Sequence, residues 1–353
     1  MNQGPAGTND EAVARTTITD IAALAGVSKS AVSYALNNKP GVSEATRARI
    51  LAIADDLAWR PSKAARALRD RRMGAIGLAL NRPARLLGLE PFYMEFISGV
   101  LEVLAPKDKF LVFKVTSSRE EEMATYQAWA AGHVVDGVLL TDLVENDPRP
   151  ALARDLRLPA VVVGPQPDGL SVARWTADGE AVREVVRYLV ALGHRQIARV
   201  AGIATYLHVK ARSQGMIEEM AALGLEPPLI IETDFSREDG AQATRRILSL
   251  PNRPTAIIYD NDVMAAVGLS VAAEMGVDVP DDVSMVAWDD SLLARLSRPP
   301  LTTTSVQVHR YSMAVVEALI DLISGGTPES GPFGGFGLAV RNSTARPKTC
   351  RGQ

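Results

Sequence analysis

The chain is poor in cysteine and histidine and has no long apolar run. Its single cysteine, Cys350, cannot form an intrachain disulfide, which fits a reducing cytoplasm. No apolar run approaches the ~20 residues that a membrane helix needs, and residues 1–15 lack the apolar core of a signal peptide. The four histidines are far apart and do not have zinc-ligand spacing. We therefore expect a cytoplasmic protein with no membrane segment, no disulfide and no cofactor.

Common catalytic motifs are also missing. The chain contains no G-x-S-x-G elbow, no G-x-x-x-x-G-K-[ST] loop and no H-E-x-x-H pair. The glycines of residues 331–337 neither follow a strand pattern nor open a helix, so they do not predict a phosphate-binding loop. The adjacent carboxyl groups of Asp289 and Asp290 could support acid–base chemistry, but turn and ligand-binding roles suit them better. An enzyme acting on carbohydrate is therefore the less favoured class.

Two short amphipathic helices are predicted between Thr17 and Asn37. Thr17 and Ser28 occupy the N-cap positions, and Ala25-Gly26-Val27 separates the two apolar patterns. The apolar positions that define the two buried faces are Ile18, Ile21, Ala22, Ala25, Val32, Ala35 and Leu36. Such a pair joined by a short Gly-containing turn is typical of a helix-turn-helix, whose second helix can enter the major groove of DNA. A plain helical hairpin is the alternative that periodicity alone leaves open.

A third helix and a basic segment follow this pair. Ser43 is the expected N-cap, and Ile50, Ile53 and Ala54 supply an apolar face. Residues 60–69 are rich in helix formers, but only about eight of them could be helical, too few for a stable helix in water, so we expect them to fold only on a partner. The first part of the chain thus divides into a disordered tail (1–16), a helix-turn-helix domain (17–61) and a hinge helix or linker (62–73).

Charge is distributed unevenly along the chain. Residues 1–72 contain 11 Lys and Arg against 7 Asp and Glu, and the remaining residues contain 27 against 34. The two parts therefore carry net charges of +4 and −7. A basic module on an acidic body favours binding of a polyanion by the N-terminal part.

From Gly74 onward, short apolar runs alternate with helix-length amphipathic segments. The runs lie at 75–80, 110–115, 136–141, 160–164, 197–202, 255–260 and 283–288. This alternation predicts an α/β core of two doubly wound parallel-sheet lobes that binds a ligand at the carboxyl ends of the strands. The residues that directly follow the runs are pocket candidates: Asn81, Thr141, Gly164, Asn261 and Asp289.

These motifs together resemble the LacI/GalR family of bacterial transcription regulators. The resemblance is carried by TITDIAALAGVSKSAVSYALNNKPGVSEATRARILAIADDLAWRPSKAARALR and IGLAL, and later by ALGHRQIA, TAIIYDNDVMAAVGL, VPDDVSMVAWDD, PPLTT and AVRNSTARP. It covers residues 17 to about 345 in order. Family membership implies a homodimer that binds operator DNA, with affinity controlled by a small molecule held in a core like that of periplasmic binding proteins. The Gly/Pro-rich tail lacks the heptads of the family's tetramers.

The resemblance also implies how the core at 74–353 divides. We expect an N-lobe at about 74–176 and 305–335, and a C-lobe at about 177–304 and 336–345. Closure of the lobes would change the separation of the two hinge segments in a dimer. A coupling of ~1–3 kcal/mol corresponds to about 5- to 150-fold in operator affinity.

The expected DNA-binding residues lie in the head and the hinge. Lys29, Ser30 and Tyr34 are predicted to reach base edges, and Ser28 and Ser33 to contact phosphates. The full set of predicted DNA contacts is Thr17, Ser28, Lys29, Ser30, Ser33, Tyr34, Asn37, Lys63 and Leu68. In the family a hinge leucine wedges into the minor groove, and Leu68 matches it. Packing of Tyr34 against the third helix is the alternative role for that side chain.

The resemblance carries over an effector site as well. Its expected residues are Asn81, Phe92, Thr141, Arg212, Phe235, Asn261 and Asp289. Arg212 and Asp289 can each take two hydroxyls of a polyol, while the phenylalanines would give apolar faces for a ring. Gly164 and Val306 stand where sugar-binding relatives often have polar side chains, so the effector is expected to be a carbohydrate-like metabolite with altered hydroxyl contacts.

The function expected from the sequence is a sequence-specific transcriptional regulator of the repressor type under control by an effector. A solute-binding protein or sugar sensor without a DNA role is the nearest alternative, because its core would have the same pattern. Such a protein would need an export signal and would not need residues 17–69. The sequence leaves open the effector, the operator, and whether the effector strengthens or weakens DNA binding.

Overall fold

The chain forms two compact units, Met1–Arg71 and Arg72–Gln353, in a computed structural model. The structure describes residues 16–57, 59, 72–82, 91–165, 173–175, 177–305, 307–328, 331–334 and 337–348. The expected tail up to residue 15 and the hinge residues Lys63 and Leu68 lie outside these described residues.

The first unit is a head of three helices around a small core. It consists of α1 (Ile18–Ala25), α2 (Lys29–Leu36) and α3 (Glu44–Asp56). Ile21, Val32 and Ile50 are fully buried where the three helices meet. Gly26 ends α1 with φ of +62°, a left-handed conformation that glycine adopts without steric cost. The chain can therefore turn sharply there and start α2 two residues after Val27.

Each of the three helices begins with a side-chain hydrogen bond at its N-terminus. The Asp20 carboxylate accepts hydrogen bonds from the backbone N–H and the hydroxyl of Thr17, at 2.7 and 2.8 Å. The hydroxyl oxygens of Ser28 and Ser43 accept from backbone N–H groups three residues later. These bonds satisfy donors that the first turn of a helix leaves unpaired.

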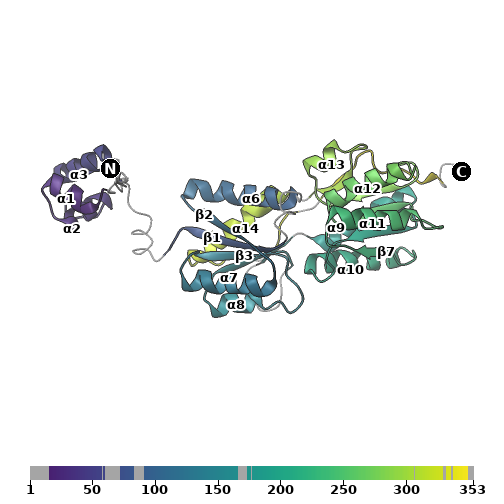
Figure 1. Ribbon diagram of the computed structural model, residues 1–353, viewed down its shortest axis with the longest axis horizontal. Coiled ribbons are helices and arrows are strands. Elements are labelled where there is room, and N and C mark those ends of the chain that lie inside the picture. The colour runs from purple at the N-terminus through teal and green to yellow at the C-terminus, as the bar shows by residue number, and fades with distance from the viewer. Residues whose placement is uncertain are drawn as a thin grey trace, which may run out of the picture. The chain divides into compact units, whose positions relative to one another are not determined.

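The second unit begins with the N-lobe, which is built on a six-stranded parallel sheet (Figure 1). In spatial order the strands are β11 (Gly331–Pro332), β5 (Ala173–Trp175), β4 (Ala160–Val163), β3 (Gly137–Leu140), β1 (Ala75–Asn81) and β2 (Phe110–Thr116). The helices are α6 (Pro91–Leu104), followed by the short 3-10 helix η1 (Ala105–Lys107), then α7 (Arg119–Ala131), α8 (Arg149–Asp155) and α14 (Val308–Ile323). α6 and α14 pack together on one face of the sheet, and α7 and α8 cover the other.

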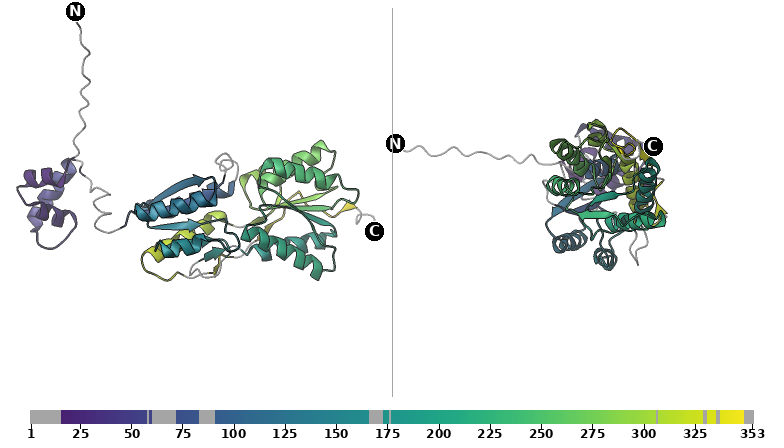
Figure 2. Two further views of the ribbon diagram at one scale, coloured as in Figure 1. Left: turned by 60° about the horizontal axis from the view of Figure 1, so that its bottom comes forward. Right: turned by 90° about the vertical axis from the view of Figure 1, so that its right-hand side faces the viewer.

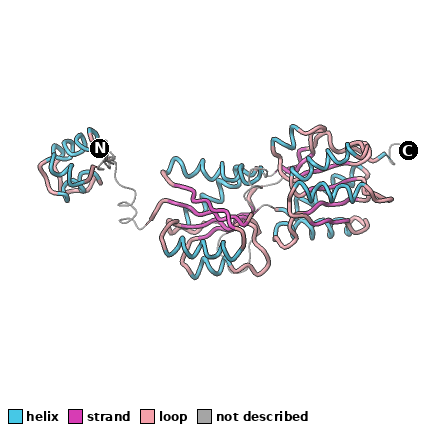
Figure 3. Tube along the Cα trace, in the orientation of Figure 1, coloured by secondary structure: helices cyan, strands magenta, loops and turns pink. Residues whose placement is uncertain are grey.

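The C-lobe repeats this plan around a second six-stranded sheet. In spatial order its strands are β12 (Gly337–Ala339), β10 (Thr302–Ser305), β9 (Ser284–Ala287), β8 (Ala256–Tyr259), β6 (Ile197–Ala201) and β7 (Leu229–Glu232). The sheet is parallel except for the β10–β12 pair. Its helices are α9 (Asp178–Leu192), α10 (Leu207–Ala222), α11 (Arg237–Leu248), α12 (Asp262–Glu274) and α13 (Leu292–Leu296). Figures 2 and 3 show the strands of both lobes between layers of helices.

The chain crosses between the lobes after β5, after β10 and after β11. The two lobes are also joined by a hydrogen-bonded contact in which the chain does not cross. The loop after β3 meets the start of α10, where Val144 and Tyr206 form an antiparallel bridge and the Leu207 N–H donates to the Leu143 carbonyl at 2.8 Å. All seven apolar runs expected as strands are parallel strands of this fold, so the predicted fold class is confirmed.

Candidate functional sites

α2 presents a polar surface on the side that faces away from the head core. Lys29 and Ser30 are exposed, Ser33 is partly exposed, and the Tyr34 side chain is 44% exposed. Ser28 sits at the helix start, where its hydroxyl oxygen accepts from the Ala31 N–H at 3.2 Å. These side chains and the N-terminus of α2 could contact base edges and phosphates of DNA.

The ring of Tyr34 rests against the loop after α2. A Cβ atom at Gly41 would lie 3.3 Å from this ring, so the ring and the glycine are in close contact. Arg47 of α3 donates to the backbone carbonyls of Ala35 and Lys39 at 3.0 and 2.7 Å, which fixes the loop. The side chain amide of Asn37 donates to the Ser33 carbonyl at 2.7 Å. Tyr34 remains 44% exposed and so keeps surface for a partner.

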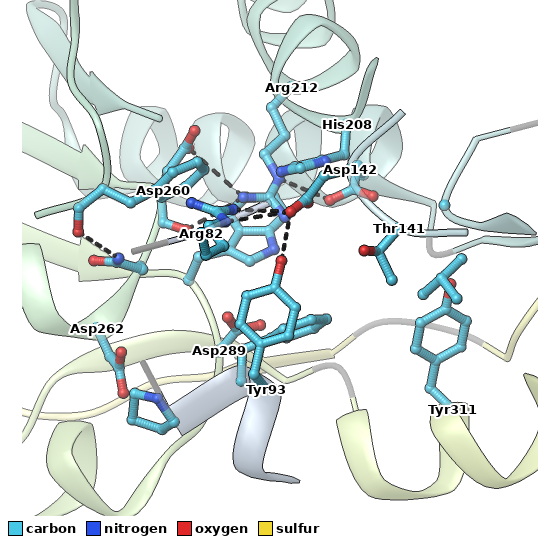
Figure 4. Close-up of a pocket in the computed structure, with 18 residues that line it drawn as sticks. Arg82, Tyr93, Thr141, Asp142, His208, Arg212, Asp260, Asp262, Asp289 and Tyr311 are labelled. Carbon is cyan, nitrogen blue, oxygen red and sulfur yellow. Dashed lines mark hydrogen bonds and ion pairs between the residues drawn. The ribbon is translucent and has the colours of Figure 1, made fainter. Parts of the chain in front are cut away.

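A cavity lies between the two lobes at the carboxyl ends of their strands (Figure 4). The free space inside it is about 100 Å³, less than the roughly 300–1,000 Å³ of drug-sized ligand sites. Its lining residues are Arg82, Pro91, Phe92, Tyr93, Thr141, Asp142, Val163, Gly164, Asp178, His208, Arg212, Phe235, Asp260, Asn261, Asp262, Trp288, Asp289 and Tyr311.

Arg212 of α10 is held at one end of the cavity by three neighbours. Its Nε donates to Asp178 at 2.7 Å, its Nη1 donates to the Asp260 carbonyl at 3.3 Å, and its guanidinium lies 3.9 Å from the centre of the Trp288 ring. Arg199 and Asp260 form a fully buried ion pair beside it, at 2.7 Å. Burial alone would raise the pKa of Asp260, but the charges of Arg199 and Arg212 and its hydrogen bonds lower it. Arg212 therefore has a fixed orientation before any ligand arrives.

A second arginine, Arg82, lines the cavity from the N-lobe. It follows β1 and donates from Nε and Nη2 to Asp142 at 3.3 and 3.2 Å. The Tyr93 hydroxyl donates to the same carboxylate oxygen at 2.5 Å. Burial acts to raise the pKa of Asp142, but Arg82, His208 and the Tyr93 hydrogen bond lower it overall.

His208 lies near both Arg212 and Asp142. Its ring is 5.7 Å from that of Tyr206 and 6.3 Å from that of Phe235. Burial and the charge of Arg212 lower its pKa, although Asp142 acts in the opposite direction. The imidazole is therefore neutral at pH 7, with one ring nitrogen able to donate and one able to accept a hydrogen bond.

Asp289 has a strongly perturbed carboxyl group. Its backbone has φ of +67°, and no described residue donates a hydrogen bond to its side chain. Burial raises its pKa to about 7, Arg212 opposes this, and the charges of Asp262, Asp178 and Asp260 add to it. The Ser291 hydroxyl donates to neighbouring Asp262, whose pKa is also raised by burial. Asp289 is therefore an acceptor for donors that a ligand would bring.

Six of the seven predicted effector residues line this cavity, and Asn81 does not. Side chains alternate across a strand, so the residue after Asn81, namely Arg82, points to the cavity instead. Phe92 is at the mouth, where its ring meets that of Tyr93 edge-on. Asn261 caps α12, with its side-chain oxygen accepting from Met264 N–H and its amide donating to the Phe235 carbonyl. Its direct role is thus to position Phe235.

The sequence prediction missed several residues that shape the cavity. The missed side chains are Arg82, Tyr93, Asp142, Asp178, His208, Asp260, Asp262, Trp288 and Tyr311. Six of them directly flank a predicted position: Arg82, Tyr93, Asp142, Asp260, Asp262 and Trp288. Considering both neighbours of each predicted position would have found these, whereas nothing local distinguishes Asp178, His208 or Tyr311.

The part of the chain that the structure describes contains no group of three or more His, Cys, Asp or Glu side chains that could hold a metal ion. None of the helices described here is both long enough and apolar enough to cross a membrane.

Two family models match the chain. Residues 17–62 match the bacterial regulatory proteins of the lacI family, and residues 186–344 match a periplasmic binding protein-like domain. The transcriptional regulator CelR of Thermobifida fusca is 32% identical over 89% of this chain and 94% of its own length. The transcriptional repressor PurR of Photobacterium profundum is 30% identical over 87% of this chain and 92% of its own length.

Solved structures give the same picture. A complex of CelR with cellobiose has a TM-score of 0.71 and 30% identity, covering 93% of this chain and 100% of the other. The lac repressor dimer bound to operator and the anti-inducer ONPF has a TM-score of 0.84 and 26% identity, covering 94% of this chain and 99% of the other.

Proposed function

The chain belongs to the lacI family of bacterial regulatory proteins, and we propose that it is a cytoplasmic repressor whose operator affinity is set by a small molecule in the interlobe cavity. The observation that carries this proposal is the presence of two sites on one chain. These are a capped helix-turn-helix with an exposed polar second helix and a preorganised polar cavity between two α/β lobes. A solute-binding protein would use the cavity but has no use for the head.

The proposed DNA contacts are made by α2 and its N-terminus. Lys29, Ser30 and Tyr34 would reach base edges, while Thr17, Ser28, Ser33 and Asn37 would hold the backbone. Tyr34 lacks the two-pronged donor of an arginine, so it would read its base by shape and a single hydrogen bond. In the hinge, Lys63 would face a phosphate and Leu68 would enter the minor groove.

The proposed effector is a neutral, carbohydrate-like molecule that is bound but not converted. The fixed guanidinium of Arg212 and the free carboxylate of Asp289 would share the hydroxyl groups of a ligand through charge-assisted hydrogen bonds. The structure of CelR with cellobiose supports a saccharide as the ligand class for this chain.

A homodimer is the proposed assembly. Several large apolar side chains are exposed on α6, on the edge strand β2 and on α13: Met94, Leu101, Phe110, Phe113, Leu292 and Leu296. Exposed apolar groups of this kind mark interaction surfaces, and the related lac repressor was solved as a dimer.

Operator binding tests this function directly. An operator would be selected from random duplexes with the full-length protein, and affinity would be measured with and without a panel of neutral sugars. Lys29→Ala should weaken operator binding. Lys107→Ala, at an exposed position of the N-lobe, should leave operator binding unchanged. A protein that selects no duplex, or that binds one with no response to Lys29→Ala, contradicts the proposal.

A further inference from the structure

One end of the cavity is already occupied by a side chain of the protein. Arg82 is only 6% exposed, and its guanidinium carbon lies 5.6 Å from the ring centre of Tyr93, 5.3 Å from that of Tyr206 and 5.0 Å from that of Phe235. Figure 4 shows Arg82 close to Tyr93 and Asp142 in the cavity. Distances below about 6 Å are those at which a cation is attracted to an aromatic ring.

The position of Arg82 is fixed by a rigid partner. Its carboxylate partner Asp142 belongs to the loop after β3, and the carbonyl of Asp142 accepts from Arg149 at 3.1 Å. Arg149 is itself 2% exposed and pairs with Glu122 and Asp147, both at 2.7 Å. The anchor of Arg82 is thus part of a buried network, so displacing the arginine would leave Asp142 without its cation.

Phe235 has no free face while Arg82 is in this position. Behind the ring lies Gly202, where an added Cβ would come within 1.9 Å of a ring atom. The ring of His208 is stacked at 6.3 Å, and Arg82 covers what remains, so that Phe235 is 7% exposed. The sequence-based prediction that Phe235 packs on a ligand ring therefore requires that Arg82 first leaves.

A second group of cavity residues, separate from the aromatic contacts of Arg82, has the features that a polar ring needs. Arg212 is oriented there by Asp178 and Trp288, and Asp289 has an unpartnered carboxylate among the described residues.

We propose that Arg82 sets the length of the effector by filling the aromatic end of the cavity, so that a single-ring ligand binds at Arg212 and Asp289 and a second ring is excluded. This proposal rests on the proposed function and adds the size of the effector to it. Removing the guanidinium without filling its place should open the faces of Tyr93, Tyr206 and Phe235 to a ligand ring.

The test compares Arg82→Ala with Arg82→Met in the full-length protein. Both variants leave Asp142 without its cation, but only alanine empties the aromatic end. Each protein would be titrated with methyl and p-nitrophenyl glycosides of glucose and galactose, with the ligand-induced shift in Tm and calorimetric Kd as readouts. We expect Arg82→Ala to bind at least one p-nitrophenyl glycoside about tenfold more tightly than wild type does, a gain typical of aromatic packing. Arg82→Met and the methyl glycosides should show no such gain.

Two results would overturn the proposal: wild type that binds the p-nitrophenyl glycosides as tightly as Arg82→Ala does, or a folded Arg82→Ala that gains no affinity. If Arg82→Ala does not fold, the double variant Arg82→Ala/Asp142→Asn removes the orphaned charge and should show the same gain. Operator binding by wild type is measured separately. Failure of the length selection therefore leaves the regulator function standing, and failure of operator binding is recognised by itself.

Discussion

Replacing Asp289 with asparagine should stabilise the protein in a pH-dependent way. In the folded chain the pKa of Asp289 is raised to about 7 from an ordinary 3.8, with burial as the main cause. A carboxyl group with a raised folded pKa binds its proton more tightly in the folded than in the unfolded state. Stability from this group is therefore present at low pH and is lost as pH rises from about 4 to about 7.

The size of the effect follows from the shift. A shift of about 3 pKa units at 1.36 kcal/mol per unit gives an upper limit of about 4 kcal/mol at pH 8. Asparagine cannot ionise and tolerates positive φ as aspartate does, so Asp289→Asn should recover part of this amount. For a unit of this size each kcal/mol corresponds to about 2–4 °C in Tm. The variant should therefore melt several degrees above wild type at pH 8 and close to it at pH 4.

Asp290 provides a matched control next in the chain. Burial alone would raise its pKa, but hydrogen bonds from Arg295 and Arg341 lower it overall. Asp290→Asn should accordingly destabilise the protein at pH 8, the opposite sign to its neighbour. Thermal melts of both variants from pH 4 to pH 8, followed by the tryptophan signal of the core, make the comparison. A Tm of Asp289→Asn that stays below wild type across this range would refute the electrostatic reasoning.

Three other changes have definite expected results. Ser28→Ala removes the N-cap of α2 and should lower the stability of the head by about 0.5–2 kcal/mol in a thermal melt followed by circular dichroism, while Ser324→Ala, at the end of α14, should not affect it. Lys29→Ala should reduce the slope of log affinity against log salt by about one if it neutralises a phosphate, and leave it unchanged if it reads a base. Arg149→Met leaves the carboxylates of Glu122 and Asp147 buried without their cation, which should lower the urea unfolding free energy by about 3–5 kcal/mol. A loss below 1 kcal/mol would show that the network is not a structural anchor.

The sequence predicts the fold well wherever hydrophobicity carries the information. The helix pair in the head and the seven central strands all have clear apolar patterns, because each buries apolar side chains on one face or on both. β10 (Thr302–Ser305) has no such pattern, although Thr302, Thr303 and Thr304 are almost fully buried. Hydrogen bonds hold Thr302 and Thr303 instead, such as that from the Thr302 N–H to the Ser343 hydroxyl at 2.8 Å, whereas the Thr304 hydroxyl has no partner among the described residues. Partners some forty residues away cannot be read from local hydropathy.

The cavity shows the same division between local and distant information. Strand ends could be located from the apolar runs, so Thr141, Asn261 and Asp289 were found from position alone. What each group does depends on neighbours from other elements. Arg82 is an occupant of the cavity because Asp142, Tyr93 and Phe235 surround it. The carboxyl group of Asp289 is an unsatisfied hydrogen-bond acceptor because no described residue donates to it. The raised pKa of Asp289 and the enclosure of Arg82 by its neighbours could therefore be recognised only from the folded structure.

The cost of burying Asp289 bears directly on ligand binding. Its carboxylate is held beside other carboxylates without a donor, which destabilises the folded chain above pH 7. A ligand hydroxyl placed there would supply the missing hydrogen bond, so part of this unfavourable energy is recovered only in the complex. Asp289→Asn should therefore be the more stable protein without ligand and yet show a smaller ligand-induced rise in Tm than wild type. If the variant were stabilised and its ligand-induced rise in Tm were undiminished, the Asp289 carboxylate would destabilise the fold without contributing to ligand binding. Recognition of the ligand would then depend on Arg212 alone.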